Sequence, residues 1–311
     1  MNFRRDQLTR TARAPAKLNL ILDVLGRRAD GFHAVETLMV PVRLADSISF
    51  TPHYSASDVA PGDIRLDVRY GGPLHRQAEL QHIPTGPQNL IVRTLRLLQE
   101  RSGCELGARV ELVKRIPAAA GLGGGSSDAA TALRLANHAW GIQWKTERLA
   151  ELAAEIGSDV PFFLYGGAAI CRGRGEQVQR LCPLASQHAV IVKPPVELST
   201  ADVYRALDQM TRDPRMARIE PLAALATRGA RELGRQMRNA LQRAASSLSP
   251  WIDRLRRTFD ELDFVGHQLS GSGSAYFGIC RHAEFQPGNF QTPTFALANS
   301  RKRAGIGQSL H

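Results

Sequence analysis

The sequence predicts an α+β protein built from two domains, and three observations lead to this prediction. Segments with strand periodicity alternate with segments of helical periodicity through the first part of the chain. Prolines and a shift in composition mark residues 181–195, and the part that follows is mainly helical. A chain of 311 residues, 43% of them hydrophobic, is long enough for two cores. We therefore expect one domain at residues 1–181 and a second at residues 182–311.

Each element is predicted from its own pattern. Short apolar segments near turn residues predict strands at residues 17–24, 35–50, 109–113 and 166–171, and a second glycine-rich element at residues 269–274 leads into the apolar residues 275–280. Apolar residues at helical spacing predict helices at residues 89–101, 129–140, 146–156, 201–210, 221–245 and 251–262. Gly157 is placed to end the third of these helices as a C′ residue would, and Pro161 fits the first turn of another.

Four stretches show weaker patterns. Residues 1–13 have the composition of a loose basic arm, and residues 27–31 of a polar turn. Residues 52–88, rich in Pro, Gly and His, predict a loop or hairpin. Residues 283–311 have little apolar content and predict a poorly ordered end, in which residues 292–298 are the candidate for a last strand.

The most informative segment is Pro-Ala-Ala-Ala-Gly-Leu-Gly-Gly-Gly-Ser-Ser at residues 117–127. Its glycines permit positive φ angles, so backbone N–H groups can converge on an anion where a helix begins. A Walker A loop requires a lysine after the glycines, and a Rossmann loop requires a glycine where Ser126 stands. The alternative is a surface loop of small residues, which the position between a strand and a helix disfavours. The segment predicts a phosphate-binding loop of another type.

Charge and cysteine content set limits on partners. The net charge of +11 is spread along the chain, and its densest part has arginines that fit solvated helix faces better than a nucleic-acid patch. These arginines are Arg235, Arg238, Arg254 and Arg257. The four cysteines form no Cys-x-x-Cys pair and predict reduced thiols rather than a zinc site. The polar N-terminus and the lack of a long apolar segment predict a cytoplasmic protein.

Six segments, in order, resemble the GHMP kinase superfamily, small-molecule kinases whose phosphate loop has the pattern of residues 117–127. Within it the chain is similar to the kinases of 4-diphosphocytidyl-2-C-methyl-D-erythritol. The resembling segments are residues 15–20, 28–33, 89–91, 117–127, 157–161 and 270–274. The resemblance implies an N-terminal domain like ribosomal protein S5 domain 2, with a left-handed β-α-β crossover, and an α/β C-terminal domain. It also implies transfer of the γ-phosphoryl group of ATP to the 2-hydroxyl of the methylerythritol unit, in a cleft between the domains.

The resemblance assigns catalysis to Lys17 and Asp159. Phosphoryl transfer requires positioning, charge stabilisation and a group that accepts the hydroxyl proton. Asp159 is expected to be the general base, and Lys17 to keep that carboxylate ionised and to offset charge on the moving phosphoryl group. From the residues alone, Lys17 is a strand lysine and Asp159 an aspartate at a helix end.

The substrate residues also follow from the resemblance. Asn19 lies one pleat from Lys17 on a strand and is expected to orient the substrate. His33 resembles the family's cytosine reader. Phe32, where the family usually has Tyr, and Tyr204 are the expected rings on either side of the base. A solvated His33 and a Tyr204 in core packing are the structural alternatives.

ATP and Mg²⁺ are the expected cosubstrate and cofactor. The resemblance implies that the loop contacts the ATP phosphates, with residues 271–274 as a second phosphate-side loop. No magnesium ligand set is assigned; Ser127 is the first candidate and Asp128 the second. The expected ATP-binding residues are Pro117, Ala118, Ala119, Ala120, Gly121, Leu122, Gly123, Gly124, Gly125, Ser126 and Ser127.

Two alternatives for the function stay open at this point. The nearest is another GHMP kinase, acting on mevalonate, homoserine or a sugar, which has no need of a cytidine pocket built by residues 28–33. The other is a basic RNA-binding protein of the same fold type, against which the phosphate loop argues. The expected partner is therefore a small-molecule substrate, with no nucleic acid and no membrane, and the chain is expected to be a monomer or a weak homodimer.

Overall fold

The structure is a computed structural model that describes residues 8–53, 62–72, 83–182, 184, 186–210, 230–281 and 295–299. The chain forms two compact units, and each is described by itself. The first unit consists of Met1–Ala16, Ala45–Ala118 and Gly123–Tyr165. The second consists of Lys17–Leu44, Ala119–Leu122 and Gly166–His311. The chain therefore passes between the units several times, and the domain boundary between residues 181 and 182 stays a prediction.

The first unit contains part of a seven-stranded sheet in which β4 (Gly107–Lys114) is an interior strand. It pairs antiparallel with the second half of β2 (His33–His53) and parallel with β3 (Ile64–Tyr70). Parallel neighbours need a crossover, and α1 (Leu90–Ser102) lies in the connection from β3 to β4. This is a β-α-β unit of the kind expected, whose handedness stays a prediction.

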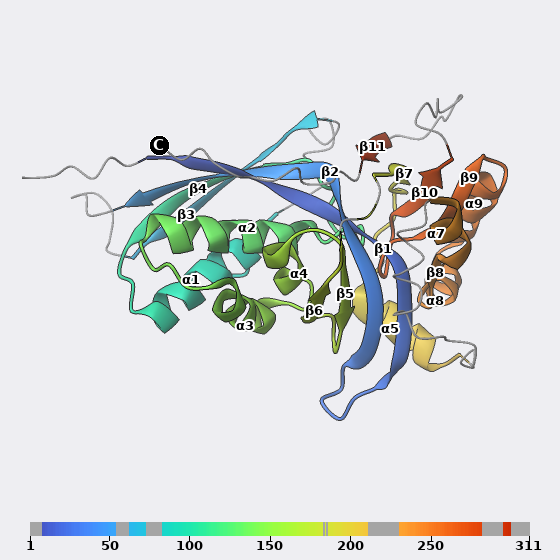
Figure 1. Cartoon of the computed structure of the whole chain (residues 1–311), viewed down its shortest axis with the longest axis horizontal. Helices are drawn as coiled ribbons and strands as arrows, with labels where there is room; N and C mark the ends of the chain where they lie inside the picture. The colour runs from blue at the N-terminus through green and yellow to red at the C-terminus, as the bar shows by residue number, and fades with distance from the viewer. Residues whose placement is uncertain are drawn as a thin grey trace, which may run out of the picture. The chain divides into compact units, whose positions relative to one another are not determined.

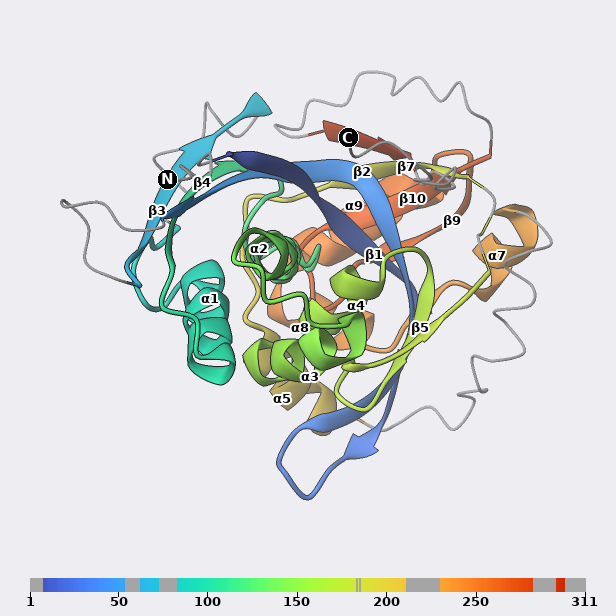
Figure 2. The ribbon, with the colours of Figure 1, turned by 60° about the vertical axis from the view of Figure 1, so that its left-hand side comes forward.

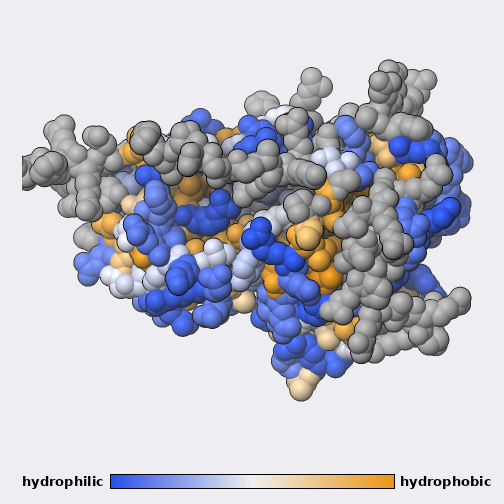
Figure 3. Space-filling view, in the orientation of Figure 1, coloured by the Kyte–Doolittle hydropathy of each residue, from blue (hydrophilic) through white to orange (hydrophobic). Residues whose placement is uncertain are grey.

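Four helices cover one face of this sheet (Figures 1 and 2). They are α1, α2 (Gly124–Ala139), α3 (Thr146–Ile156) and α4 (Val160–Tyr165). Leu95, Leu98 and Leu133 on their apolar stripes are buried, as are Val110 and Leu112 of the sheet. In Figure 3, hydrophilic residues cover much of the outer side of the described helices, with smaller apolar patches between them.

The second unit begins with the hairpin of β1 (Arg10–Arg27) and β2, drawn in blue in Figures 1 and 2. Both strands are long enough to contribute residues to each unit. Within the second unit, β2 pairs antiparallel with β5 (Ala169–Arg172), and β5 with β6 (Gln177–Arg180). β1 pairs in parallel with the short β8 (Arg238–Asn239).

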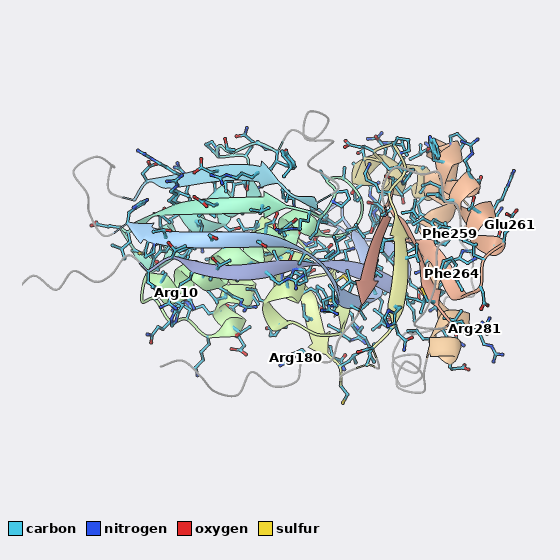
Figure 4. The ribbon with its side chains drawn as sticks, turned by 90° about the horizontal axis from the view of Figure 1, so that it is seen from above. Arg10, Arg180, Phe259, Glu261, Phe264 and Arg281 are labelled. Carbon is cyan, nitrogen blue, oxygen red and sulfur yellow. The ribbon has the colours of Figure 1, made fainter. Side chains whose placement is uncertain are left out.

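A second sheet has the antiparallel order β11 (Phe295–Asn299), β7 (His188–Val192), β10 (Tyr276–Cys280) and β9 (Phe264–Leu269). The helices of this part are α5 (Thr200–Asp208), α7 (Ala230–Gln236), α8 (Gln242–Leu248) and α9 (Pro250–Asp260). Phe259 of α9 stacks on Phe264 of β9 with ring centroids 5.0 Å apart. Figure 4 labels both residues. Val203, Ile252 and Tyr276 complete the centre of this core and are fully buried.

Most predicted elements are confirmed, and five predictions are wrong. β1 begins at Arg10, inside the predicted arm, and β3 lies inside the predicted loop. In residues 230–245 the predicted helix is replaced by α7, β8 and the start of α8, because residues 238–239 pair with β1. Gly157 ends α3 as predicted, but it is the C-cap, with an extended backbone at φ −178°, and the predicted C′ position with its left-handed backbone is wrong. The predicted final strand is confirmed as β11; residues 221–229 and most of 283–311 lie outside the described part.

Arg238 is the fifth wrong prediction, because it is not on a solvated helix face. It binds both carboxylate oxygens of Asp23, at 2.9 and 2.5 Å, across 215 positions of sequence. The Asp23 side chain is 2% exposed, so this is an ion pair with a buried partner. No helix in the described part of the chain has the length and apolar content needed to cross a membrane.

Candidate active site

A buried polar network surrounds Lys17 in the second unit. Lys17 Nζ donates to Asn19 Oδ1 at 2.5 Å, and Asn19 Nδ2 donates to Thr37 Oγ1 at 2.8 Å. Thr37 in turn donates to the carbonyl oxygen of Ile21 at 2.7 Å. All three polar side chains are less than 5% exposed. The predicted sharing of one face by Lys17 and Asn19 is therefore confirmed, and the ammonium group has a fixed direction.

The two glycine-rich segments predicted from the sequence lie against each other in the second unit. Ser270 Oγ donates to the carbonyl oxygen of Gly121 at 3.0 Å. The backbone N–H of Ala275 donates to the carbonyl oxygen of Ala120, also at 3.0 Å. Side chains would prevent this approach. A Cβ atom on Gly121, whose φ is +71°, would lie 2.0 Å from the carbonyl oxygen of Ser270. Glycine is required here for both conformation and space.

This pair of segments also meets the Lys17 network. The backbone N–H of Lys17 donates to the carbonyl oxygen of Leu122 at 2.9 Å. A Cβ atom on Gly271 would lie 3.2 Å from Lys17 Nζ and 3.4 Å from Asn19 Oδ1, so both side chains border that glycine. The second unit thus places a buried cation beside two segments of nearly bare backbone. Such a surface suits an anionic ligand.

In the first unit, the loop continues into α2 earlier than the sequence indicated. Gly123 is the left-handed N-cap, with φ 68°, and residues 124–127 form the first turn of the helix. The predicted loop glycines Gly124 and Gly125 and the serines Ser126 and Ser127 are therefore helical. Their backbone N–H groups lie at the positive end of the helix dipole, where a phosphate is favoured.

Beneath this helix start lies a buried ion cluster that the sequence interpretation missed. Lys114 Nζ of β4 donates to Asp46 Oδ2 and, at 2.9 Å, to Asp128 Oδ2 of α2. Asp46 Oδ1 accepts the backbone N–H groups of Arg115 and Ile116. The three charged side chains are at most 4% exposed. The sequence feature that could have indicated this cluster is a single aspartate, Asp46, and a single lysine, Lys114, within apolar strand patterns.

The charges of the cluster are interdependent. Burial raises the pKa of Asp128 to about 8, and the neighbouring Asp46 adds to this, while Lys114 acts in the opposite direction. Burial by itself would lower the pKa of Lys114, but Asp128 and Asp46 raise it above its ordinary value. Lys114 is therefore a firmly held cation that joins two strands to the start of α2.

The turn at residues 28–32 is organised by Asp30. Its carboxylate accepts from Arg28 Nε at 3.0 Å and from the backbone N–H of Phe32 at 3.2 Å. The hydrogen bond from Arg28 lowers the pKa of Asp30. Phe32 is 52% exposed, and the guanidinium of Arg174 lies 4.9 Å from the centroid of its ring. An exposed aromatic ring held on an ordered turn can stack on a base.

His33 and Tyr204, both predicted substrate residues, lie side by side. Their rings stack with centroids 4.7 Å apart and an interplanar angle of 25°. His33 Nε2 is also 2.7 Å from Asp208 Oδ1, a residue the sequence interpretation missed. One face of Tyr204 thus lies against His33, and a base held between Phe32 and Tyr204 stays a prediction.

Asp159 lies in the first unit, in the turn between α3 and α4, with intermediate burial. Lys17 lies in the second unit, so the pairing of these two residues stays a prediction. Ser127 Oγ and Asp128 Oδ1 are buried and have no hydrogen-bond partner among the described residues. No group of three or more metal-binding side chains occurs in the described ranges.

Known proteins share this architecture. The GHMP kinases N terminal domain matches residues 89–167, and the GHMP kinases C terminal domain matches residues 221–286. A 4-diphosphocytidyl-2-C-methyl-D-erythritol kinase of Pelotomaculum thermopropionicum is 39% identical, over 88% of this chain and 90% of its own. The protein of the same name from Bacillus subtilis is 34% identical, over 87% and 88%.

Solved structures agree with these relatives. A 4-(cytidine 5'-diphospho)-2C-methyl-D-erythritol kinase superimposes with a TM-score of 0.69 at 36% identity, covering 88% of this chain and 90% of that one. A homoserine kinase from Cytophaga hutchinsonii has a TM-score of 0.66 at 21% identity, covering 91% and 89%, which shows the fold alone. The chain belongs to the GHMP kinase superfamily. Within it, the chain falls in the family of 4-diphosphocytidyl-2-C-methyl-D-erythritol kinases.

The close approach at Gly121 can be tested with Gly121→Ala. Gly141→Ala is the control, because Gly141 has nearly the same φ, +72°, but nothing within 4 Å of an added Cβ. The control should cost about 1 kcal/mol for backbone strain alone. In Gly121→Ala the free energy of unfolding in urea should fall further than in the control, because the new Cβ overlaps Ser270. The KM for ATP should also rise. Equal losses with an unchanged KM would contradict this packing.

The ion cluster can be tested with Lys114→Met. The change leaves two buried carboxyl groups without their cation, so the free energy of unfolding should fall by about 3 kcal/mol or more. Arg109→Met is the control on the same strand, since its partner Asp67 is 49% exposed and the pair should contribute less than about 1 kcal/mol. Urea unfolding measures both variants. A loss in Lys114→Met no larger than in the control would mean that the cluster does not support the helix start.

Proposed function

We propose that this chain is an ATP-dependent kinase that phosphorylates the 2-hydroxyl of 4-diphosphocytidyl-2-C-methyl-D-erythritol. Relatives with 34–39% identity over most of the chain have this activity in their names. The observation that carries the choice of substrate is the ordered turn at residues 28–32, which displays Phe32 and adjoins His33. An aromatic face and an imidazole suit a pyrimidine base, which mevalonate and homoserine lack.

The reaction forms a bond between the acceptor oxygen and the γ-phosphorus and breaks the bond from that phosphorus to the β,γ-bridging oxygen. Asp159 takes the proton of the 2-hydroxyl as it attacks, and ADP leaves with the electrons of the broken bond. Lys17, held by Asn19, stabilises the negative charge of the transferring group. The cation is fixed before the reaction begins, so little reorganisation is needed.

The donor nucleotide is assigned to the glycine loop. The backbone N–H groups at the start of α2 and those of residues 119–122 are the proposed donors to the phosphates. Ser127 Oγ, a buried oxygen without a partner among the described residues, fits a hard cation such as Mg²⁺. Asp128 is the second candidate, since only its Oδ2 is bonded to Lys114. Bound Mg²⁺ would supply neutralisation of the phosphate charge.

The decisive experiment measures ADP release with three acceptors offered separately: the cytidylated methylerythritol, mevalonate and homoserine. Rapid release only with the cytidylated acceptor supports the proposal. Turnover of mevalonate or homoserine instead would assign the chain to another branch of the superfamily. RNA binding with a steep salt dependence and no turnover would favour the RNA-binding alternative.

Asp159→Asn should remove the general base while preserving its shape. The kcat should fall by about a hundredfold or more, with the Kd for ATP nearly unchanged, as measured by ADP release and calorimetry. Glu155→Gln is the control, since it lies on the preceding helix, 48% exposed and paired with Arg101. Normal turnover in Asp159→Asn would exclude its role as base.

Phe32→Ala should weaken the binding of the cytosine base and leave the binding of ATP unaffected. Stacking on an aromatic ring contributes about 1–3 kcal/mol per base, so the KM for the cytidylated substrate should rise about tenfold and that for ATP should stay unchanged. Leu25→Ala removes another exposed apolar side chain, 57% exposed, from the same hairpin and should change neither. If Phe32→Ala raised both KM values equally, the stacking role would be wrong.

A further inference from the structure

We propose that Asp208 is a positioning residue for base recognition. Its carboxylate fixes the His33 ring so that Nδ1 is presented to the cytosine as a hydrogen-bond acceptor, which favours cytosine over uracil. The inference rests on the proposed function, because it takes a cytidylated substrate as given. It adds a residue outside the segments that resemble the family.

The contact between the two side chains assigns the hydrogen. His33 Nε2 lies 2.7 Å from Asp208 Oδ1. An ionised carboxylate can only accept, so Nε2 must carry the hydrogen. In the neutral ring Nδ1 is then left with a lone pair. The partner of one ring nitrogen thereby sets the chemistry of the other.

Two residues of one helix hold the ring from different directions. Tyr204 and Asp208 are four positions apart on α5, so they share a helix face. Tyr204 stacks on the flat side of the ring, and Asp208 binds its edge. Stacking restrains the plane of the imidazole, while the hydrogen bond decides which nitrogen faces α5. Together they leave the ring one orientation.

The helix that carries both residues is itself well anchored. Ser199 caps its N-terminus by accepting from the backbone N–H of Asp202, and Val203 is fully buried in the core of the second unit. The His33 side chain is only 9% exposed and that of Asp208 is 32% exposed. Partial removal from water strengthens a hydrogen bond to a charged acceptor, so this contact can hold the ring.

The lone pair on Nδ1 determines which base fits. At position 4 cytosine carries an amino group, a donor, whereas uracil carries a carbonyl oxygen, an acceptor. Nδ1 with a lone pair accepts from the amino group and repels the carbonyl oxygen. A base that leaves a polar group unpaired in a partly buried site loses affinity. Without Asp208 the hydrogen can move to Nδ1, and the preference is reduced.

Kinetics of Asp208→Ala test this role. The KM for the cytidylated substrate should rise about tenfold, and the kcat/KM preference over the uridylated analogue should fall by a similar factor. The kcat and the KM for ATP should stay near wild-type values. Asp208→Asn retains an oxygen that can accept from Nε2 and should restore part of the preference. Asp202→Ala is the control, because it removes an exposed carboxylate from the same helix, paired with Arg205.

The imidazole itself provides a readout that does not depend on turnover. In protein labelled with ¹⁵N-histidine, the His33 signals, identified by their loss in His33→Gln, should show hydrogen on Nε2 and a bare Nδ1. In Asp208→Ala these signals should shift toward those of the tautomer that carries its hydrogen on Nδ1. If Asp208→Ala does not fold, Asp208→Asn gives the same comparison.

Three results would overturn the inference. They are an unchanged base preference in the Asp208 variants, a fall in kcat with both KM values raised, or hydrogen on both nitrogens of His33 in the wild-type protein. Failure of the proposed function is a separate outcome. The wild-type protein would then not phosphorylate the cytidylated acceptor, whereas the NMR spectra would still report whether Asp208 fixes the ring.

Discussion

The ammonium group of Lys114 joins three parts of the first unit at the point where the glycine loop becomes a helix. Asp46 belongs to β2, Lys114 to β4 and Asp128 to the second turn of α2, and each is nearly inaccessible to water. A buried cation between two carboxyl groups tolerates little displacement, because each charge relies on the others for compensation. Since Asp46 also holds the backbone of Arg115 and Ile116, the chain that leaves β4 toward the loop has a fixed path. The donors at the start of α2 depend on that path.

The second unit reaches comparable order by a different route. There the backbone segments at Gly121 and Gly271 come close because they lack side chains, and Lys17 and Asn19 border them. The turn at residues 28–32 follows a related principle, since Asp30 supplies the hydrogen bonds that a loop otherwise takes from water. In both places the polar groups are oriented in the protein before a ligand arrives. Such preorganisation lowers the cost of binding and of charge stabilisation.

Local patterns predicted the elements well, and long-range contacts explain the failures. The helices at residues 89–101 and 146–156 follow from apolar spacing alone. β3 was missed although Ile64, Leu66 and Val68 alternate with charged residues, because the surrounding Pro and Gly dominated the interpretation. The pairs of Arg238 with Asp23 and of Asp208 with His33 join residues 215 and 175 positions apart, which a single sequence does not reveal. The resemblance supplied Lys17, His33 and the loop, but not the residues that hold them in place.

In the proposed reaction the glycine loop, the Lys17 network and the turn at residues 28–32 serve the phosphorylation of one defined hydroxyl group. Proton-coupled ³¹P NMR of the product made from ATP and the cytidylated methylerythritol tests this claim most directly. The 2-hydroxyl is on a carbon without hydrogen, so the new phosphomonoester should give a singlet beside the diphosphate signals. A doublet or triplet would place the phosphate on a hydroxyl at another carbon. Formation of ADP with no new monoester would exclude phosphorylation of this acceptor.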